Sequence, residues 1–425
     1  MHKFYIEAHG CSRRLMDGEW INNYMLANGC RRVGHPAQAR DIILVTCGLT
    51  HPMAEECFLR IAQLQKHAGR LLVYGCLPAM FPDKLKAPIN GKLLVTQDIC
   101  RFDEFFPHFT KRFSDVPDAN TVLKVHGNGM TLKAAVGVFL ACQRNRIRKW
   151  NKLWVSEYTS AWPIHERFRK GLADLYRLRL PVIEGVFGGI GFNPGIASVR
   201  VSEGCAGHCS YCGIKRAIGK IQSKPIARIC DELKLLAGAR RYRLNLCSSD
   251  IGAYGMDIQS DFPELVNTIL MFDSRFRIEF LQDLNPFWAC YYQKQLVDLV
   301  GSNRILSILM PVQSGSPRIL KLMRRELDLK RFRQVIQDIR KKDPRVRLKT
   351  QVIIGFPGET QEDFRDTLTY LDGCRFDQVD AFAYHEVAGT ESVALLPKVP
   401  YQIVQARLGQ LIRALPPFTI KAIGT

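Results

Sequence analysis

The sequence lacks any apolar run long enough to span a membrane, and residues 1–8 lack the hydrophobic region of a secretory signal peptide. Internal repeats and low-complexity tracts are also absent, which argues against repeat architectures. Acidic residues are scarce beside basic ones, 40 against 60, so the formal net charge is +20. Such a surface attracts polyanions, and nucleic acid and acidic peptides are both candidate partners. We expect a cytoplasmic protein with no membrane association.

The rest of the composition is that of an ordinary globular protein. A chain of 425 residues can form two or three domains with separate cores, and 47% apolar and 24% charged residues are typical values. Its 14 cysteines are unusual. Because the cytosol keeps thiols reduced, metal or redox use explains them better than structural disulfides do.

Three of these cysteines form a C-x3-C-x2-C triplet, Cys205, Cys209 and Cys212, directly after a short β-type run. Thiolates hold iron–sulfur clusters, and clusters that only transfer electrons take four. Three thiolates on one loop can bind three irons of a four-iron cluster and leave one iron open. A zinc knuckle and unconnected buried thiols are the alternatives, but structural zinc normally takes four Cys or His ligands. The triplet predicts a cluster that binds a further ligand.

From residue 192 to residue 385, β-type runs alternate with helical runs, which is typical of parallel strands joined by crossover helices. The predicted strands are 198–201, 243–246, 277–281, 305–311, 349–354 and 378–383. A helix with the apolar face Ile226, Ile229, Leu233 and Leu236 follows the first strand. Six strands predict a partial (β/α)6 barrel, whose active site would lie at the carboxyl ends of the strands, where the triplet is.

Residues 1–118 predict a separate, doubly wound α/β domain with strands at 3–7, 41–46 and 71–74. Each strand leads within a few residues to a cysteine: Cys11, Cys47 and Cys76. Loops that follow parallel strands emerge at one edge of a sheet, so the three thiols can converge there. Their spacing is too wide for a local knuckle, and small buried residues remain the alternative reading.

Residues 121–180 differ in composition, because basic residues such as Arg146, Arg148 and Lys149 interleave with Trp150 and Trp154. This mixture can bind a phosphate backbone and stack on bases, grip an acidic peptide, or form a helical insertion with a solvated basic face. We divide the chain into an N-terminal domain (1–118), a basic, aromatic-rich insertion or linker (119–190), a barrel core (191–395) and a C-terminal helical tail (396–425).

The two triplets and the motifs around them resemble those of the radical S-adenosylmethionine (SAM) methylthiotransferases. The matching motifs are Gly10-Cys11 with Asp17 and Glu19, Thr46-Cys47, Gly75-Cys76, Ile218-Gly219-Lys220, Asp250 with Ala253-Tyr254-Gly255, Gln313-Ser314-Gly315-Ser316, Met323 with Arg325, and Gly355-Phe356-Pro357-Gly358-Glu359-Thr360. The resemblance covers nearly all of residues 1–118 and 191–415.

The resemblance implies two 4Fe-4S clusters, SAM, and an electron donor such as flavodoxin or ferredoxin. The second triplet would hold the cluster that cleaves SAM to a 5'-deoxyadenosyl radical, and the first an auxiliary cluster whose open iron carries the sulfur. The residues expected to bind the cofactors besides the cysteines are Tyr211, Asp250, Gln313, Gly355 and Glu359. Asp250 as a helix cap and Gly355 as a turn residue remain equally open.

Some features depart from the family pattern. Arg14 and Val45 stand where asparagine is usual, and the family's C-terminal TRAM β-barrel has no counterpart after Gly389-Thr390. Residues 384–400 resemble the branch that modifies an aspartyl β-carbon of a ribosomal protein, and lack the arginine that the tRNA branch carries before Gly-Thr.

The expected activity is therefore insertion of a methylthio group at an unactivated C–H bond of a peptide or protein side chain, with an aspartyl β-carbon as the expected acceptor. A ribosomally made precursor peptide is one candidate substrate. A tRNA adenosine is the second candidate substrate. A non-catalytic iron–sulfur sensor or electron-transfer protein is the alternative outside the enzyme class. The remaining cysteines are predicted to be buried small residues: Cys30, Cys57, Cys100, Cys142, Cys230, Cys247, Cys290 and Cys374.

Overall fold

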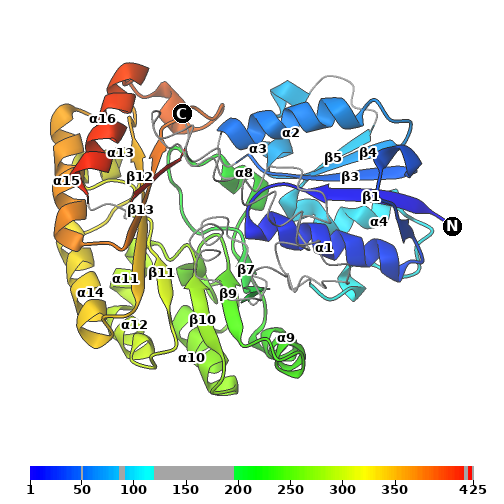
Figure 1. The fold of residues 1–425 in the computed structure, drawn as a ribbon, viewed down its shortest axis with the longest axis horizontal. Coiled ribbons are helices and arrows are strands. Elements are labelled where there is room, and N and C mark those ends of the chain that lie inside the picture. The colour runs from blue at the N-terminus through cyan, green and yellow to red at the C-terminus, as the bar shows by residue number, and fades with distance from the viewer. Residues whose placement is uncertain (49–50, 86–90, 119–195, 416–419, 424–425) are drawn as a thin grey trace, which may run out of the picture.

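The computed structural model describes residues 1–48, 51–85, 91–118, 196–415 and 420–423. They form two α/β units that lie side by side, with helix α8 (Ile214–Ile218) between them (Figure 1). The predicted α/β class is confirmed. The insertion expected at 119–190 lies outside the described residues. Within the described part of the chain, no helix is both long and apolar enough to cross a membrane.

The N-terminal unit is a five-stranded parallel sheet of order β2-β1-β3-β4-β5. Its strands are β1 (Lys3–Ala8), β2 (Arg31–Arg32), β3 (Asp41–Thr46), β4 (Arg70–Gly75) and β5 (Gly91–Val95). The three strands predicted from the sequence are present, and β2 and β5 were not predicted. This order is the doubly wound one, in which connections leave β1 and β3 in opposite directions.

Helices cover both faces of this sheet (Figure 1). Helices α1 (Ser12–Ala27) and α4 (Phe102–Phe105) cover one face, and α2 (His51–Leu64) and α3 (Leu77–Met80) cover the other. The central strand β3 is buried along its whole length. Ile43 and Val45 pack toward the α1 layer, whereas Ile42 and Leu44 pack toward the α2 layer. A strand covered on both sides needs a continuous apolar run, which explains its sequence.

The second unit is a seven-stranded parallel sheet of order β14-β13-β12-β11-β10-β9-β6. Its strands are β6 (Ile196–Arg200), β9 (Arg243–Cys247), β10 (Arg277–Leu281), β11 (Ser307–Leu309), β12 (Arg347–Ile354), β13 (Gln378–Ala383) and β14 (Ile420–Ile423). All six predicted strands are present. The seventh, β14, pairs in parallel with β13, so the region expected to be a helical tail also completes the sheet. A two-stranded ribbon, β7 (Ser202–Glu203) and β8 (Gln222–Ser223), follows β6.

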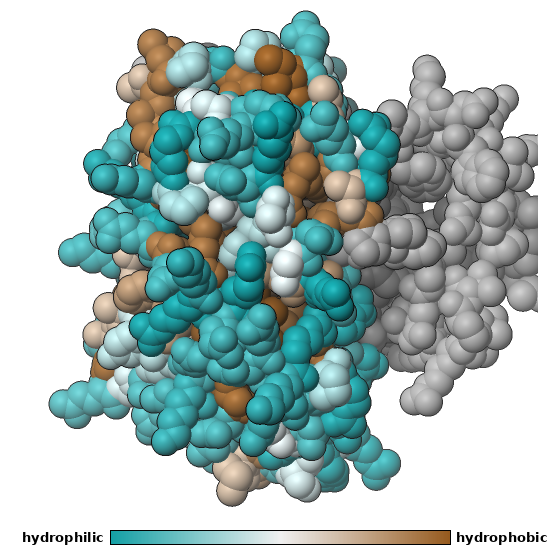
Figure 2. Space-filling model, turned by 90° about the vertical axis from the view of Figure 1, so that its left-hand side faces the viewer, coloured by the Kyte–Doolittle hydropathy of each residue, from teal (hydrophilic) through white to brown (hydrophobic). Residues whose placement is uncertain are grey.

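The barrel helices lie outside this sheet (Figure 1). They are α9 (Ile226–Gly238), α10 (Phe262–Phe272), α11 (Pro286–Tyr291), α12 (Gln293–Val300), α13 (Pro317–Leu322), α14 (Leu329–Lys342), α15 (Gln361–Cys374) and α16 (Tyr401–Ala414). The predicted face of α9 is confirmed, since Ile229, Leu233 and Leu236 are buried. The outer face of this helix layer is mostly hydrophilic (Figure 2), so the apolar sides of the helices face the sheet.

Candidate functional site

The N-terminal cysteines follow the central strands of their sheet. Cys11 comes after β1 and Cys47 directly after β3, and Cys76 comes directly after β4. In a doubly wound sheet of this order, β1 and β3 flank the switch point, and ligands bind outside the carboxyl ends of the strands there. The predicted convergence of the three loops at one edge is therefore what the topology produces.

Two glycines allow these loops to approach one another closely. Gly10 has a φ of +120°, and a Cβ added to it would lie 2.4 Å from Cβ of Cys47. Gly75 has a φ of +130°, and a Cβ there would lie 2.1 Å from the carbonyl oxygen of Thr46. Both positions combine a left-handed backbone with a contact that excludes any side chain. The Gly-Cys pairs are thus required by the geometry of the loops.

The three N-terminal thiols influence one another electrostatically. A hydrogen bond from Cys47, together with the charges of Arg13 and Arg14, lowers the pKa of the Cys11 thiol well below its ordinary value. Burial raises the pKa of Cys76 to about 11, although Arg14 opposes this. The charges of Arg13 and Arg14 thus favour the thiolate form of Cys11, which is the form in which cysteine binds an iron–sulfur cluster.

Among the described residues, no group of three or more Cys, His, Asp or Glu side chains is close enough to hold one metal ion. The assignment of the two triplets to iron–sulfur clusters therefore stays a prediction from their residue types and their spacing in the sequence.

Arg14, which departs from the family pattern, is buried beside this triplet at 1% exposure. Its Nη1 lies 2.7 Å from Oδ2 of Asp17, and its guanidinium lies over the ring of Tyr74. Its Nε has no hydrogen-bond partner within the described residues. The charge of Arg14 is thus balanced mainly by Asp17, and it acts on the Cys76 thiol nearby.

The second triplet lies on the loop that leaves β6 and the short strand β7. The backbone N–H of Gly207 donates to Sγ of Cys205 at 3.2 Å. A Cβ at Gly207 would lie 3.4 Å from Sγ of Cys205 and 3.9 Å from Sγ of Cys209, so the loop keeps the space between these thiols free of side chains. Burial raises the pKa of Cys205 to about 12. This donor set fits three irons of a cluster.

Arg325 and Tyr211 support this loop. The Nη1 of Arg325 lies 3.6 Å from Sγ of Cys209, and its Nη2 donates to the carbonyl oxygen of Pro311 at 2.7 Å. The ring of Tyr211 packs edge-on against Phe356, with centroids 6.3 Å apart. A guanidinium beside a thiol stabilises the thiolate that metal binding requires. Arg325 was matched as a motif residue, but sequence reasoning gave it no role.

Asp250 and Gln313 carry unsatisfied polar atoms at strand ends near the second triplet. Asp250 is 2% exposed, and its Oδ2 accepts from Sγ of Cys205 at 3.7 Å. Burial raises the pKa of Asp250 to about 6. Its Oδ1 and the Oε1 of Gln313 have no hydrogen-bond partner within the described residues. Asp250 precedes a 3₁₀ helix but makes no side-chain cap bond, so the cap alternative is not realised.

Gly355 and Glu359 hold each other. The backbone N–H of Gly355 donates to Oε2 of Glu359 at 2.8 Å, and Nη1 of Arg407 on α16 donates to the same oxygen at 2.6 Å. Gly355 has a φ of +79°, and a Cβ there would lie 2.4 Å from a methyl carbon of Val404. These contacts explain both residues as parts of a turn that docks α16 onto the sheet.

The two triplets meet at the junction of the units. Cys76 and Met80 share an apolar cluster with Ala217, Ile218 and Val387, and Cys205 packs against that cluster. Below it, ion pairs join the units. Arg200 on β6 donates to Oδ1 of Asp17 on α1 at 2.6 Å. One cysteine of each triplet therefore contacts the same apolar cluster at the junction between the two units.

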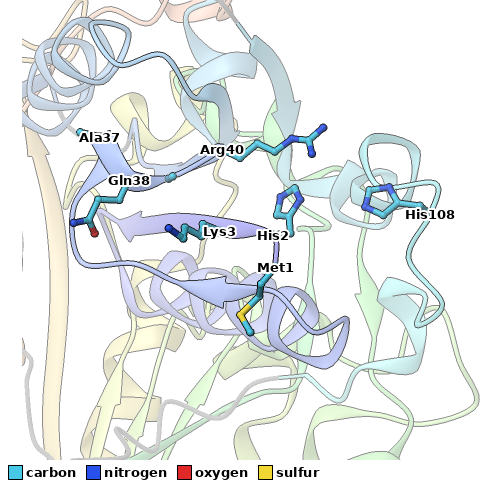
Figure 3. A pocket seen from close by; sticks show the side chains of 8 residues that line it. Met1, His2, Lys3, Ala37, Gln38, Arg40 and His108 are labelled. Carbon is cyan, nitrogen blue, oxygen red and sulfur yellow. The ribbon is translucent and has the colours of Figure 1, made fainter.

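A basic pocket of about 510 Å³ lies at the opposite edge of the N-terminal sheet, at the amino end of β1. Figure 3 shows the side chains of His2, His108 and Arg40 converging there, with Lys3 alongside. The Oδ2 of buried Asp41 binds Nε2 of His2 at 2.5 Å. This pocket lies away from the cysteine loops, which leave the carboxyl ends of the strands.

The other cysteines follow the sequence prediction in part. Cys30, Cys57, Cys247, Cys290 and Cys374 are buried. The prediction was wrong for Cys100, which is exposed, and Cys230 is half-buried. Cys142 lies outside the described residues.

Two family models match the chain. Residues 199–371 match the radical SAM superfamily, and residues 3–96 match the uncharacterized protein family UPF0004. The first match contains the second cysteine triplet, and the other contains the first triplet.

Curated relatives match almost the whole chain. The ribosomal protein uS12 methylthiotransferase RimO of Syntrophomonas wolfei is 27% identical over 413 residues, which are 95% of this chain and 81% of the relative. The tRNA-2-methylthio-N(6)-dimethylallyladenosine synthase of Carboxydothermus hydrogenoformans is 25% identical over 425 residues, with 96% and 82% coverage. Relatives that act on a protein and on tRNA are thus equally similar.

Solved structures share the fold. The radical SAM methyltransferase TsrM from Kitasatospora setae, with cobalamin and a 4Fe-4S cluster bound, gives a TM-score of 0.57 at 13% identity and covers 92% of this chain and 74% of its own. The cobalamin-dependent SAM radical enzyme OxsB gives 0.54 at 10% identity, with 99% and 58% coverage. At these identities the likeness concerns the fold alone.

Proposed function

The chain belongs to the radical SAM methylthiotransferase family, and on that basis we propose that it transfers a methylthio group to an unactivated carbon of a peptide or protein side chain. The observation that carries the proposal is the meeting of two cysteine triplets at one junction, where Cys76 and Cys205 contact the same apolar cluster. Sulfur insertion requires a sulfur-bearing centre and a radical-generating centre within reach of one substrate atom. An electron-transfer protein has no such requirement.

Each triplet would hold one 4Fe-4S cluster: Cys11, Cys47 and Cys76 the auxiliary cluster, and Cys205, Cys209 and Cys212 the cluster that binds SAM. When bound, the clusters and SAM supply electron transfer, the substrate radical and the sulfur, and the protein supplies position and exclusion of water.

The protein residues around the second triplet have separable tasks. Arg325 contacts Sγ of Cys209 and ties its loop to the carbonyl oxygen of Pro311. Asp250 and Gln313 present the unpaired oxygens Oδ1 and Oε1, which suit the ammonium group and the ribose hydroxyls of SAM. The apolar cluster of the junction keeps water and other hydrogen donors away from a radical.

The peptide substrate is supported by the segment whose sequence resembles the protein-modifying branch. Residues 384–400 lie directly on the second cysteine loop. The backbone N–H of Ser392 donates to the carbonyl oxygen of Ser210 at 3.0 Å, and Val387 lies against Gly213. The residues that distinguish the two branches therefore contact the loop that carries Cys209 and Cys212.

The proposal is tested by anaerobic reconstitution followed by mass spectrometry of candidate peptides and of digested tRNA. We expect about eight irons per chain, and about four in the variant with Cys205, Cys209 and Cys212 all changed to alanine. The expected product is a peptide with an added methylthio group. Methylthiolation confined to nucleosides would overturn the peptide substrate. A protein that holds both clusters but releases no 5'-deoxyadenosine from SAM would overturn the proposed enzymatic activity.

A tRNA adenosine is the second candidate, and two observations favour it: the net charge of +20 and the basic pocket at the amino end of β1. Phosphate contacts make nucleic-acid binding strongly salt-dependent. A double change of Lys3 and Arg40 to glutamate would then weaken tRNA binding and flatten its salt dependence.

A further inference from the structure

Arg13 crosses the junction between the two units. It stands in the first turn of α1, two residues after Cys11. Its Nη1 donates to Oδ2 of Asp283 at 2.9 Å, and the same nitrogen donates to the carbonyl oxygen of Ser248. The side chain is 14% exposed. Ser248 and Asp283 follow β9 and β10, so one guanidinium joins the N-terminal cysteine loop to the ends of two barrel strands.

Neighbouring contacts extend this connection to the second triplet. The Oγ of buried Ser248 contacts the Oγ of Ser202 at 2.7 Å and accepts from the backbone N–H of Asp250 at 3.1 Å. Asp250 in turn accepts from the thiol of Cys205. A continuous series of contacts therefore leads from the loop of Cys11, through Arg13, to the loop of Cys205.

The residues on both sides are held in place. Asp283 has a φ of +57°, a conformation that costs free energy in a non-glycine residue and persists only where surrounding contacts fix it. Beside it, Oγ of Ser12 contacts Sγ of Cys247 on β9 at 3.6 Å. On the other side, Nη2 of Arg200 donates to the carbonyl oxygen of Arg13 at 3.4 Å. Arg13 is thus bound through its side chain and its backbone.

We propose that Arg13 is a positioning residue that fixes the distance between the two cysteine triplets by binding the first turn of α1 to the ends of β9 and β10. It touches neither the substrate nor a thiol of the second triplet, so it acts through the loops that it joins. Its catalytic consequence rests on the function proposed above. Transfer between two centres is sensitive to misplacements of about 1 Å, because reacting atoms must come within ~3–3.5 Å.

The test compares four proteins: wild type, Arg13→Met, Arg13→Lys and the control Arg101→Met. Methionine keeps an unbranched apolar side chain and removes the charge and the donors. Lysine keeps the charge and can keep one of the two bonds. Arg101 lies in the same unit but is half exposed and pairs only with Asp98 and Glu104 in its own segment, so its loss leaves the junction intact.

Three quantities are measured: iron per chain, moles of 5'-deoxyadenosine released per methylthiolated product, and deuterium exchange of the amides at 12–20 and 248–253. In Arg13→Met we expect SAM cleavage at the second triplet to persist, with the ratio of 5'-deoxyadenosine to product raised about tenfold or more, because a misplacement of about 1 Å can cost on the order of 10²-fold in rate. Iron should be unchanged in Arg13→Lys, which keeps the charge beside Cys11. Exchange should rise in both segments. The product ratio and the exchange of Arg13→Lys should lie between those of wild type and Arg13→Met. The control Arg101→Met should match wild type.

The outcomes separate this inference from the proposed function. Arg13→Met with both clusters, an unchanged product ratio and unchanged exchange would overturn the positioning role and leave the proposed function intact. A wild-type protein with only about four irons, or without methylthiolated product, would overturn the proposed function, and the exchange measurement would still decide whether Arg13 joins the units. If Arg13→Met does not fold, the same three quantities are compared between Arg13→Lys and wild type.

Discussion

Replacement of Gly10 by alanine should remove the auxiliary cluster and spare the other one. The added Cβ would lie 2.4 Å from Cβ of Cys47, 3.1 Å from its Sγ and 3.5 Å from Cγ of Arg14. Carbon atoms in contact prefer about 3.5–4.0 Å. The loops that carry Cys11 and Cys47 must therefore separate by roughly 1 Å, which three thiols fitted to one cluster do not tolerate.

The free-energy cost of Gly10→Ala has two sources, and a second variant separates them. At a φ of +120°, an alanine is strained by about 1–3 kcal/mol, and the overlap with Cys47 adds about 1–3 kcal/mol. Gly29 also has a positive φ, +75°, but nothing lies within 4 Å of a Cβ built there. Gly29→Ala is the matched control, because it carries the strain of roughly 1–2 kcal/mol without the overlap.

The assay is iron counting after anaerobic reconstitution, combined with thermal unfolding. We expect about eight irons in wild type and in Gly29→Ala, and about four in Gly10→Ala. SAM cleavage should persist in all three proteins, since the second triplet is untouched. About eight irons in Gly10→Ala would refute the reasoning, because it would mean that close approach of the two loops is not needed for the auxiliary site.

Three further predictions follow from single contacts. Burial raises the pKa of Glu7, but hydrogen bonds from His9, Arg60 and Tyr5 outweigh it and lower that pKa to about 2 from the ordinary 4.5. The Glu7 carboxylate adds at most about 3 kcal/mol to the free energy of unfolding. This contribution is complete above pH 4.5 and is lost as the pH falls toward 2. The difference in melting temperature between wild type and Glu7→Gln should therefore shrink below pH 4.5. A difference that stays constant with pH would contradict this pKa. Iodoacetamide should modify exposed Cys100 in the native protein and spare buried Cys57, whose pKa burial raises to about 12; mass spectrometry of the labelled peptides decides, and equal labelling would count against the structure. Gly355→Ala places a Cβ 2.4 Å from a side-chain carbon of α16 and should lower the melting temperature, whereas Gly238→Ala meets nothing within 4 Å and should not.

The sheets could be predicted from the sequence because their strands carry continuous apolar runs. All nine predicted strands are present, since fully buried parallel strands give a strong signal. The short strand β2 consists of two exposed arginines, Arg31 and Arg32, and gives no such signal. Strand β14 was not predicted either. It pairs with the edge strand of a sheet whose six other strands were predicted from the sequence.

The convergence of the N-terminal cysteines could be inferred from topology, because parallel strands place their following loops at one edge. The contacts that join the two units could not. Arg13 and Asp283 are 270 positions apart, and neither lies in a pattern that marks a partner. Asp250 was undecidable for a different reason, since a carboxylate at the end of a strand can serve either as a helix cap or as a ligand. Cys100 was predicted wrongly, because the average burial of cysteine says little about the outer side of a short 3₁₀ helix.

The ion pairs at the base of the junction restrict how the two units can dock. Asp17 is 0% exposed and Arg200 is 5% exposed, and each comes from a different unit. A slipped or rotated arrangement would break this pair and leave Asp17 with Arg14, and Arg200 with Glu203, as partners from their own units. Apolar surfaces alone would permit neighbouring arrangements at little cost. Charge pairing therefore selects one arrangement out of many, and it does so without occupying the space in which a substrate must be received.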